Sequence, residues 1–292
     1  MATLREVLEA AERSHVAVGH FNFSDLVTLR AVATAARELA VPVMVGVSEG
    51  ERAFLGVRQA AAAVKTCREE FGLPLFLNAD HTHSLEKAEE AARNGYDEII
   101  VDRSELPIEE NVKQTRRALE AIKSINPSIL VEGEIGYIGT SSEILDKVPE
   151  GVGALTTPEE ARQFIAATGV DVLAPAVGNM HGLLHSMVQG RTQKRLDIAR
   201  IAQLKTATGI FMTLHGGSGT NDADFQEAIR AGINIIHINT ELRVAWRRGL
   251  EAALANEPGA VAPYKILPGA FDAVKDVVRA RLQLFSLTHV GA

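Results

Sequence analysis

Short apolar runs alternate with amphipathic helical segments along most of the chain. Eight runs are expected to form strands, at residues 16–23, 41–48, 73–81, 97–102, 128–135, 170–177, 210–214 and 233–239. Near-continuous apolar strands separated by helices predict a parallel sheet covered by helices. Eight such units in 292 residues predict an α/β fold, a single-domain (β/α)8 TIM barrel over 1–292 with an additional C-terminal helix near 270–285. The alternative is an open doubly wound sheet, but the dinucleotide-binding Gly-x-Gly-x-x-Gly turn is absent after the first strand.

Composition excludes several classes of function. The chain is 46% hydrophobic and 23% charged, as in globular proteins, and its net charge of −7 argues against nucleic-acid or membrane partners. No apolar run approaches the roughly 20 residues of a membrane span, and the N-terminus lacks the apolar segment of a secretory signal. A single cysteine, Cys67, precludes an intramolecular disulfide and fits a reducing compartment. We therefore expect a cytoplasmic protein.

Histidines and acids gather where the expected strands end. In a barrel the C-terminal strand ends form one rim, and that rim carries the catalytic groups. The segment Leu77–His83 (LNADHTH) places a carboxylate and two imidazoles there, and only His15 and His289 lie clearly away from the rim. The rim candidates are His20, His81, His83, His181, His185, His215 and His237, together with the acids Asp80, Asp102, Glu132 and Glu134.

Three imidazoles from separate strands can meet at one metal ion. Zn²⁺ with three protein ligands and one open position is the common catalytic arrangement, although imidazoles also suit iron, cobalt or nickel. No Cys-x-x-Cys or His-Glu-x-x-His spacing supports a metal site locally. The alternative is that some rim histidines only hydrogen-bond a phosphate or a backbone carbonyl, an interpretation we favour for His20, His83 and His185.

A glycine-rich segment follows the seventh expected strand. Residues 215–220 read HGGSGT, and Asn239 with Thr240 ends the eighth strand. Glycines let a backbone approach a ligand closely, and successive N–H groups can hold an anion. Because barrels often bind phosphate between the loops after strands seven and eight, this cluster predicts a phosphate site. The polar stretch 137–155 is long for a loop and is expected to be functional.

Several motifs, in order along nearly the whole chain, carry a family resemblance. They are Val18–Asn22, Ala79–His81, Val101–Asn111, Val131–Gly136, Leu155–Ala161, Thr168–Asp171, His181-Gly182, Leu214–Gly219 and Asn239–Arg243. With these motifs the chain resembles the class II, metal-dependent ketose-bisphosphate aldolases, which include the fructose- and tagatose-bisphosphate aldolases. The resemblance implies a small phosphorylated sugar as substrate and a homodimer or homotetramer, for which the C-terminal helix is a candidate interface.

The resemblance also implies roles for matching residues. Three histidines would bind one catalytic Zn²⁺: His81, His181 and His215. Asp102 and Glu134 would hold a second divalent or displaced ion, and the family implies room for a monovalent cation. Asp80 would be the acid/base on the aldehyde half, and a loop carboxylate would move the ketone-side proton, with Glu143 preferred to Asp146 and Glu150. Substrate and phosphate contacts would come from Asn22, Ser48, Gly182, Gly216, Ser218, His237, Asn239 and Thr240.

The implied reaction is reversible cleavage of fructose 1,6-bisphosphate to dihydroxyacetone phosphate and glyceraldehyde 3-phosphate. Zinc would polarise the ketone carbonyl as a Lewis acid, and Asp80 would take the C4 hydroxyl proton. A Schiff-base aldolase is disfavoured because no lysine lies in any expected strand. The alternatives are the same chemistry on tagatose 1,6-bisphosphate or another phosphorylated ketose, a non-catalytic sugar-phosphate-binding barrel, and a zinc hydrolase.

Five positions depart from the family pattern, and they cluster around the expected substrate. Leu184-His185 stands where many members carry Tyr-Lys, whose lysine helps to bind phosphate. His237 replaces an asparagine, Arg103 a small residue and His20 an alanine. Because histidine is only partly charged at neutral pH, the missing lysine weakens the case for two phosphates. Arg103 could supply the missing charge, or the substrate could differ.

Overall fold

Eight parallel strands close into a barrel. The computed structural model describes residues 2–286, with the strand order β1-β10-β9-β7-β5-β4-β3-β2. The strands are β1 (Val18–Asn22), β2 (Val43–Val47), β3 (Leu75–Thr82), β4 (Glu98–Val101), β5 (Leu130–Ile135), β7 (Val172–Pro175), β9 (Phe211–Leu214) and β10 (Ile235–Ile238). All neighbouring strands pair in parallel, including β1 with β10. The predicted (β/α)8 barrel is confirmed, and the open sheet is excluded.

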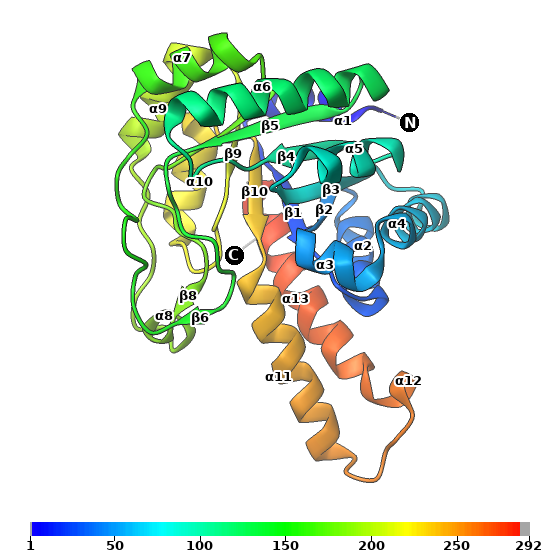
Figure 1. Cartoon of the computed structure of the whole chain (residues 1–292). Coiled ribbons are helices and arrows are strands. Elements are labelled where there is room, and N and C mark those ends of the chain that lie inside the picture. The colour runs from blue at the N-terminus through cyan, green and yellow to red at the C-terminus, as the bar shows by residue number, and fades with distance from the viewer. Residues whose placement is uncertain (1, 287–292) are drawn as a thin grey trace.

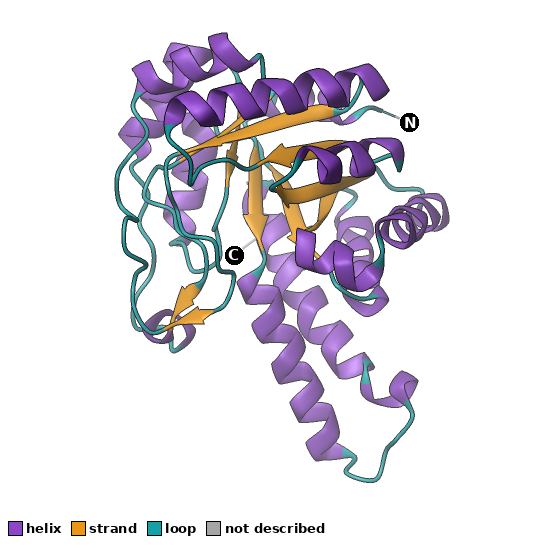
Figure 2. Cartoon of the chain, viewed as in Figure 1, coloured by secondary structure: helices purple, strands orange, loops and turns teal. Residues whose placement is uncertain are grey.

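Helices surround the barrel (Figure 1, Figure 2). They are α1 (Leu4–Arg13), α2 (Leu26–Leu39), α3 (Glu49–Leu55), α4 (Val57–Phe71), α5 (Leu85–Arg93), α6 (Ile108–Ile125), α7 (Pro158–Thr168), α8 (His185–Val188), α9 (Ile198–Thr208), α10 (Asp222–Ala231), α11 (Thr240–Asn256), α12 (Pro263–Ile266) and α13 (Pro268–Phe285). A small parallel sheet of β6 (Ile144–Leu145) and β8 (Leu183–Leu184) lies apart from the barrel. None of the helices in residues 2–286 combines the length and apolarity needed to cross a membrane.

Helix α1 closes the N-terminal end of the barrel. Thr3 and Glu6 form a capping box that fixes where the helix begins. Its apolar face packs under the barrel floor in one buried cluster of Leu4, Leu8, Ala11, Val18, Met44, Phe76, Leu130, Val172 and Ile235. Because this apolar plug fills one end, polar groups at the strand ends collect at the other end, where the rim histidines lie.

The predicted additional C-terminal helix is α13, and it packs on its own barrel. Its Val274, Val278, Leu282 and Phe285 are buried in the main core. Helix α13 runs beside α11, and the two continue beyond the barrel to α12, forming a projecting arm (Figure 1). His289, predicted to lie away from the rim, falls outside the described residues.

One glycine of β2 makes room for a histidine inside the barrel. A Cβ atom at Gly46 would overlap Cε1 and Nε2 of His20. The His20 ring is fully buried and stacks on the ring of His237, with centroids 3.5 Å apart, so it cannot move aside freely. The histidine at position 20 therefore fits only because Gly46 on β2 has no side chain.

We expect Gly46→Ala to lower the free energy of unfolding by about 1–3 kcal/mol, because the added methyl group overpacks the barrel interior. In a His20→Ala background the same substitution should cost much less. Urea unfolding of the four proteins in this double-mutant cycle measures the coupling. An equal cost in both backgrounds would show that the His20 ring is not what Gly46 accommodates.

Candidate active site

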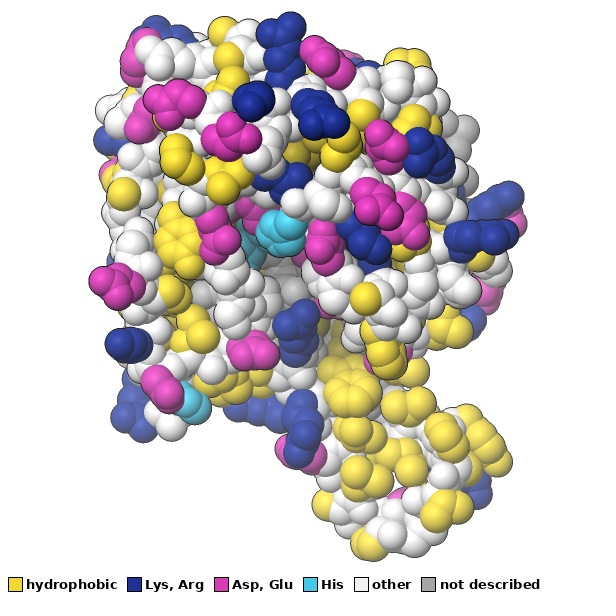
Figure 3. Space-filling view, viewed as in Figure 1, with side chains coloured by type: hydrophobic (Ala, Val, Ile, Leu, Met, Phe, Trp, Pro, Cys, Tyr) yellow, Lys and Arg dark blue, Asp and Glu magenta, His cyan; other side chains and the backbone are white. Residues whose placement is uncertain are grey.

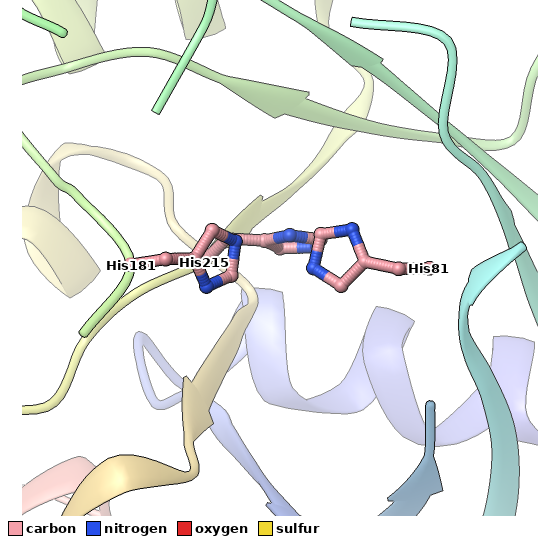
Figure 4. A group of neighbouring side chains, drawn as sticks. All are labelled: His81, His181 and His215. Atoms are coloured by element: carbon pink, nitrogen blue, oxygen red, sulfur yellow. The ribbon is translucent and has the colours of Figure 1, made fainter. Parts of the chain in front are cut away.

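Three histidine rings meet at the C-terminal rim of the barrel. His81 lies at the end of β3, His181 lies between β7 and β8, and His215 directly follows β9. The ring centroid of His81 is 4.8 Å from those of His181 and His215, which are 5.8 Å from each other. Figure 4 shows the rings turned toward one another. One nitrogen from each lies within 4.8 Å of the other two, so a single ion can reach all three.

Each ring leaves one buried nitrogen without a hydrogen bond. Among the described residues, these atoms are Nε2 of His81, Nε2 of His181 and Nδ1 of His215. Unpaired buried polar atoms are costly, and three that converge fit the ligand set of a catalytic zinc site. His81 also has a φ of 41°, a left-handed conformation that costs a non-glycine residue about 1–3 kcal/mol. The surrounding structure therefore holds this ring in place.

Carboxylates hold the opposite nitrogens of two of these rings. Oδ2 of Asp102 lies 2.8 Å from Nδ1 of His81, and Oε1 of Glu132 lies 2.6 Å from Nε2 of His215. Such pairs fix the tautomer and orientation of metal-binding histidines. Oε2 of Glu134 lies 3.3 Å from Nδ1 of His215 and 3.7 Å from Nδ1 of His81. The structure thus brings Asp102 and Glu134, the two residues predicted for a second divalent ion, together with His81.

These acids set the charge state of the imidazoles. Burial opposes protonation of His81, but Asp80, Asp102 and Glu134 together raise its pKa to about 9. Burial is likewise outweighed at His215, whose pKa rises well above its usual value beside Glu132 and Glu134. The pKa of His181 falls because of burial and the neighbouring imidazoles. A site this rich in negative charge suits a divalent cation, which would displace the bound protons.

Asp80 lies beside the three imidazoles. Its Oδ1 is 3.8 Å from Nε2 of His81 and 3.6 Å from Nδ1 of His237, and its Oδ2 accepts a hydrogen bond of 2.8 Å from Asn22. Burial alone would raise the pKa of Asp80, but His81, His237 and His20 hold it well below its usual value. The carboxylate is therefore ionised, which is the protonation state that a general base needs.

A third group, His20 with Asp80 and His237, also has three ligand atoms close together. The rings of His20 and His237 are parallel, however, with an interplanar angle of 3° and centroids 3.5 Å apart. A metal ion binds imidazole in the plane of the ring, so one ion cannot lie in both planes. Burial lowers the pKa of His20 to about 4 and that of His237 as well. We therefore assign His20 and His237 as neutral imidazoles that stack on each other beside Asp80.

The predicted phosphate residues line one narrow cleft. Its lining comprises Asn22, Asp80, Ser142, His181, Gly182, Gly216, Ser218, His237, Asn239 and Thr240. Gly182 and Gly216 have φ values of 76° and 59°, and a Cβ on either would overlap a backbone carbonyl. Oγ of Ser218 accepts hydrogen bonds from the backbone of Asn239 and Glu241 at the start of α11. Helix N-termini favour phosphate because free N–H groups and the helix dipole point at it.

A second cleft of about 190 Å³ opens beside the first, with Ser48, His81, Asp102, Thr140, Ser142, His181 and Arg243 in its lining. Figure 3 shows histidine side chains in a hollow of this face. Thr140 and Ser142 belong to the long 137–155 loop, which Arg243 holds by a 3.1 Å bond to the Ser142 carbonyl. The side chain of Glu143 is exposed and lines neither cleft. The structure thus brings together all the predicted site residues except the Glu143 carboxylate.

The geometry agrees with comparisons to known proteins. The sequence profile of the family described as "Fructose-bisphosphate aldolase class-II" matches residues 2–289. The chain belongs to this family. It is 33% identical over 295 residues to a fructose-bisphosphate aldolase of Geobacillus stearothermophilus, covering 100% of this chain and 99% of that protein. Two solved structures share the fold: the YdjI aldolase of Escherichia coli K12 (27% identity, TM-score 0.77, 97% and 96% covered) and a chain from Coccidioides immitis (26%, 0.82, 98% and 96%).

As a class II aldolase, the protein is a carbon–carbon lyase.

Two site acids were not predicted to have a role. Glu51 accepts bonds of 2.9 Å from both Asn22 and Arg243, and its capping box with Ser48 was the available sequence signal. Glu132 was recognised only as a rim acid, although its spacing of two from Glu134 on a strand places both on one face. Together they orient the side chains that line the clefts.

Two residues that depart from the family pattern, Arg103 and His185, do not lie where they could bind a substrate phosphate. The Arg103 guanidinium donates to the carbonyls of Thr82 and Asp102 and to Gln114. It supports the backbone that positions Asp102, and the alternative that it supplies phosphate charge is not supported. His185 is exposed and pairs with Asp146, 3.3 Å away. Neither residue therefore supplies a positive charge to the clefts.

Glu132→Gln should weaken zinc binding by roughly tenfold or more, because it removes the charge that orients His215 and increases its basicity. Competition with a metallochromic chelator measures the affinity. Glu159→Gln on the exposed surface of α7 is the matched control and should not change it. Unchanged zinc affinity in Glu132→Gln would contradict the assignment of Nδ1 of His215 as a ligand.

Proposed function

We propose that this aldolase reversibly cleaves fructose 1,6-bisphosphate to dihydroxyacetone phosphate and glyceraldehyde 3-phosphate, with zinc bound by His81, His181 and His215. The observation that carries the proposal is the position of Asp80. An ionised carboxylate lies 3.8 Å from the free nitrogen of His81, in a cleft shared with the glycines predicted to bind phosphate. The name of the Geobacillus relative, a fructose-bisphosphate aldolase, supports this substrate.

The acid/base chemistry belongs to this chain's own residues. Zinc bound at the three histidines would supply Lewis-acid polarisation of the ketone carbonyl. Asp80 takes the proton from the C4 hydroxyl during cleavage and returns it during condensation. Asn22 donates to one oxygen of Asp80, which leaves the other oxygen, the one beside His81 and His237, to face the substrate.

Glu143 is our candidate for the ketone-side proton. Its carboxylate is exposed, so it can act only if the 137–155 loop moves toward the substrate. The cleft of about 190 Å³ is smaller than the roughly 300–1,000 Å³ of typical ligand sites. Both observations support a loop that opens to admit substrate and then closes with a different placement of Glu143.

Backbone groups would hold the ketone-side phosphate. Gly182, Gly216, Ser218 and Thr240 line the narrow cleft, and Thr240 is the first residue of α11. Asn239 and Ser48 complete the polar surroundings from the neighbouring cleft. We also propose a second divalent site at Asp102 and Glu134, and one catalytic domain over residues 1–292.

The alternatives are less well supported. Tagatose 1,6-bisphosphate would need the opposite configuration at C4, and the curated relative is named for the fructose substrate. A binding protein without turnover would not require Asp80 together with all three ligand histidines. A hydrolase on the same rim does not explain the family membership. None of the described strands carries a lysine for a Schiff base.

Asp80→Ala should lower kcat for fructose 1,6-bisphosphate cleavage by roughly 10²–10⁴-fold, because the general base is lost, while zinc content stays the same. Asp146→Ala, on the loop, is the control and should retain activity. Chelator should abolish wild-type cleavage, and added zinc should restore it. Equal turnover of the tagatose epimer, or full activity in Asp80→Ala, would overturn the proposal.

We also propose that the protein is a homodimer or homotetramer and is cytoplasmic. The arm, residues 249–269, carries apolar side chains that are strongly exposed: Leu254, Val261 and Tyr264, the last two at 91% and 78% exposure. Figure 3 shows apolar side chains gathered over this projecting segment. Exposed apolar patches of this kind commonly mark protein–protein interfaces, and a second copy of the chain is the partner that the family resemblance implies.

Replacing Val261 and Tyr264 together by serine should convert the oligomer to a smaller species, because the apolar contact area is lost. Light scattering after size-exclusion chromatography measures the mass. Phe54→Ser is the control, since Phe54 is 79% exposed but lies outside the arm. An unchanged mass in the double variant would show that the arm does not form the interface.

A further inference from the structure

A buried lysine ties together two segments of the site. Lys194 is 4% exposed. Its Nζ donates to the backbone carbonyls of Met180, Gly182 and Gly216, at 2.7, 2.7 and 2.9 Å. Met180 and Gly182 flank His181, and Gly216 follows His215. One amino group therefore fixes the relative position of the backbones that carry two of the three proposed zinc ligands.

The three bonds require the charged form of Lys194. Each carbonyl oxygen can only accept, and only an ammonium group has three N–H donors. Burial lowers the pKa of Lys194 to about 7, and Glu241 raises it slightly, but the neutral amine would leave one carbonyl unpaired. None of the three bonded partners is a carboxylate. The positive charge is therefore held by peptide dipoles alone and is not cancelled by a bonded anion.

The peptide units that Lys194 binds are also bonded at their opposite edges. The N–H of His181 donates to Ile138 and that of Leu183 to Glu143, both in or beside the 137–155 loop, at 2.8 and 2.9 Å. The N–H of Gly217 donates to His237 at 3.1 Å. The ammonium group is thus the common anchor of a network that reaches the 137–155 loop, the phosphate cleft and strand β10.

Backbone carbonyls that converge on one point are the donors with which proteins bind alkali-metal ions. We propose that the Lys194 ammonium replaces a bound monovalent cation in this chain. It is a positioning residue for the His181 and His215 segments, and in its ammonium form it places a positive charge beneath the phosphate cleft. This charge takes the place of the lysine that position 185 lacks. Only the catalytic consequence of this inference rests on the proposed function.

A different role for Lys194 would be a Schiff-base nucleophile. Such a lysine needs a neutral amine that faces the substrate. Lys194 lines neither cleft of the site, and all three of its N–H groups are directed at carbonyls. The geometry therefore favours the structural cation over the nucleophile.

Lys194→Met tests the proposal, because methionine keeps the length of the stem and removes only the ammonium group. In choline chloride, the Tm of the variant should fall by roughly 5 °C or more, and its zinc affinity should fall roughly tenfold. Potassium or ammonium chloride at the same ionic strength should restore at least half of both losses. The wild type should show the same Tm and zinc affinity in all three salts.

Lys123→Met is the matched control. Lys123 also donates to two backbone carbonyls, those of Pro127 and Ile129, but it pairs with Asp171 at the opposite end of the barrel. Its loss should lower Tm equally in every salt. If Lys194→Met does not fold in choline chloride, its recovery from denaturant in potassium or ammonium chloride is compared with that in choline chloride.

Three results would overturn the proposal: a wild type that needs potassium, a Lys194→Met defect that is equal in all salts, or no salt-specific recovery on refolding. Borohydride trapping of dihydroxyacetone phosphate on Lys194 of the wild type would do so as well. Thermal stability and zinc affinity do not require turnover. A wild type that fails to cleave fructose 1,6-bisphosphate would therefore refute the proposed function and leave this test intact.

Discussion

Closure of the barrel between β1 and β10 is the constraint on which the site depends. This pairing sets His20 opposite His237, although the two residues lie near opposite ends of the chain. It also lets His237 approach Asp80 on β3, which an open sheet would place several strands away. With α1 filling the other end, every polar strand end must be satisfied at a single rim. The site is the consequence of closing eight parallel strands so that their C-terminal ends share one rim.

Charge balance at that rim explains why buried acids are paired with the imidazoles. Isolated buried charges are unfavourable, and each must find a partner. The pairs Asp102 with His81 and Glu132 with His215 supply those partners. The same pairs leave one nitrogen of each ring free. The acids therefore keep the imidazoles oriented whether or not an ion is bound, and the left-handed backbone of His81 is tolerated because this network holds it.

The sequence predicts the barrel because periodicity and helix caps are local signals. Because strand ends converge in any such barrel, it also predicts that the rim histidines lie together, and the family resemblance selects His81, His181 and His215 among them. The sequence could not predict which contacts each polar side chain makes in the folded protein. Arg103 was a candidate for phosphate binding, yet it supports Asp102, since a guanidinium next to two carbonyls is satisfied there. Glu143 remains a prediction for the ketone-side proton, because the conformation of its loop depends on contacts such as Arg243 with Ser142, which no local pattern encodes.

Lys194 shows why matching residues one position at a time can mislead. At position 185 the chain has lost a lysine, and judged alone this loss argues against a phosphorylated substrate. The folded chain brings an ammonium group to the same loops from the segment before α9, beneath the glycines instead of beside them. A positive charge beneath the glycines is buried, so backbone carbonyls have to bond it. The N–H groups of the same peptide units are bonded as well, which keeps those carbonyls in position. Those requirements are met by the backbone around His181 and His215, so in this chain the arrangement of the metal ligands and the supply of positive charge depend on the same side chain.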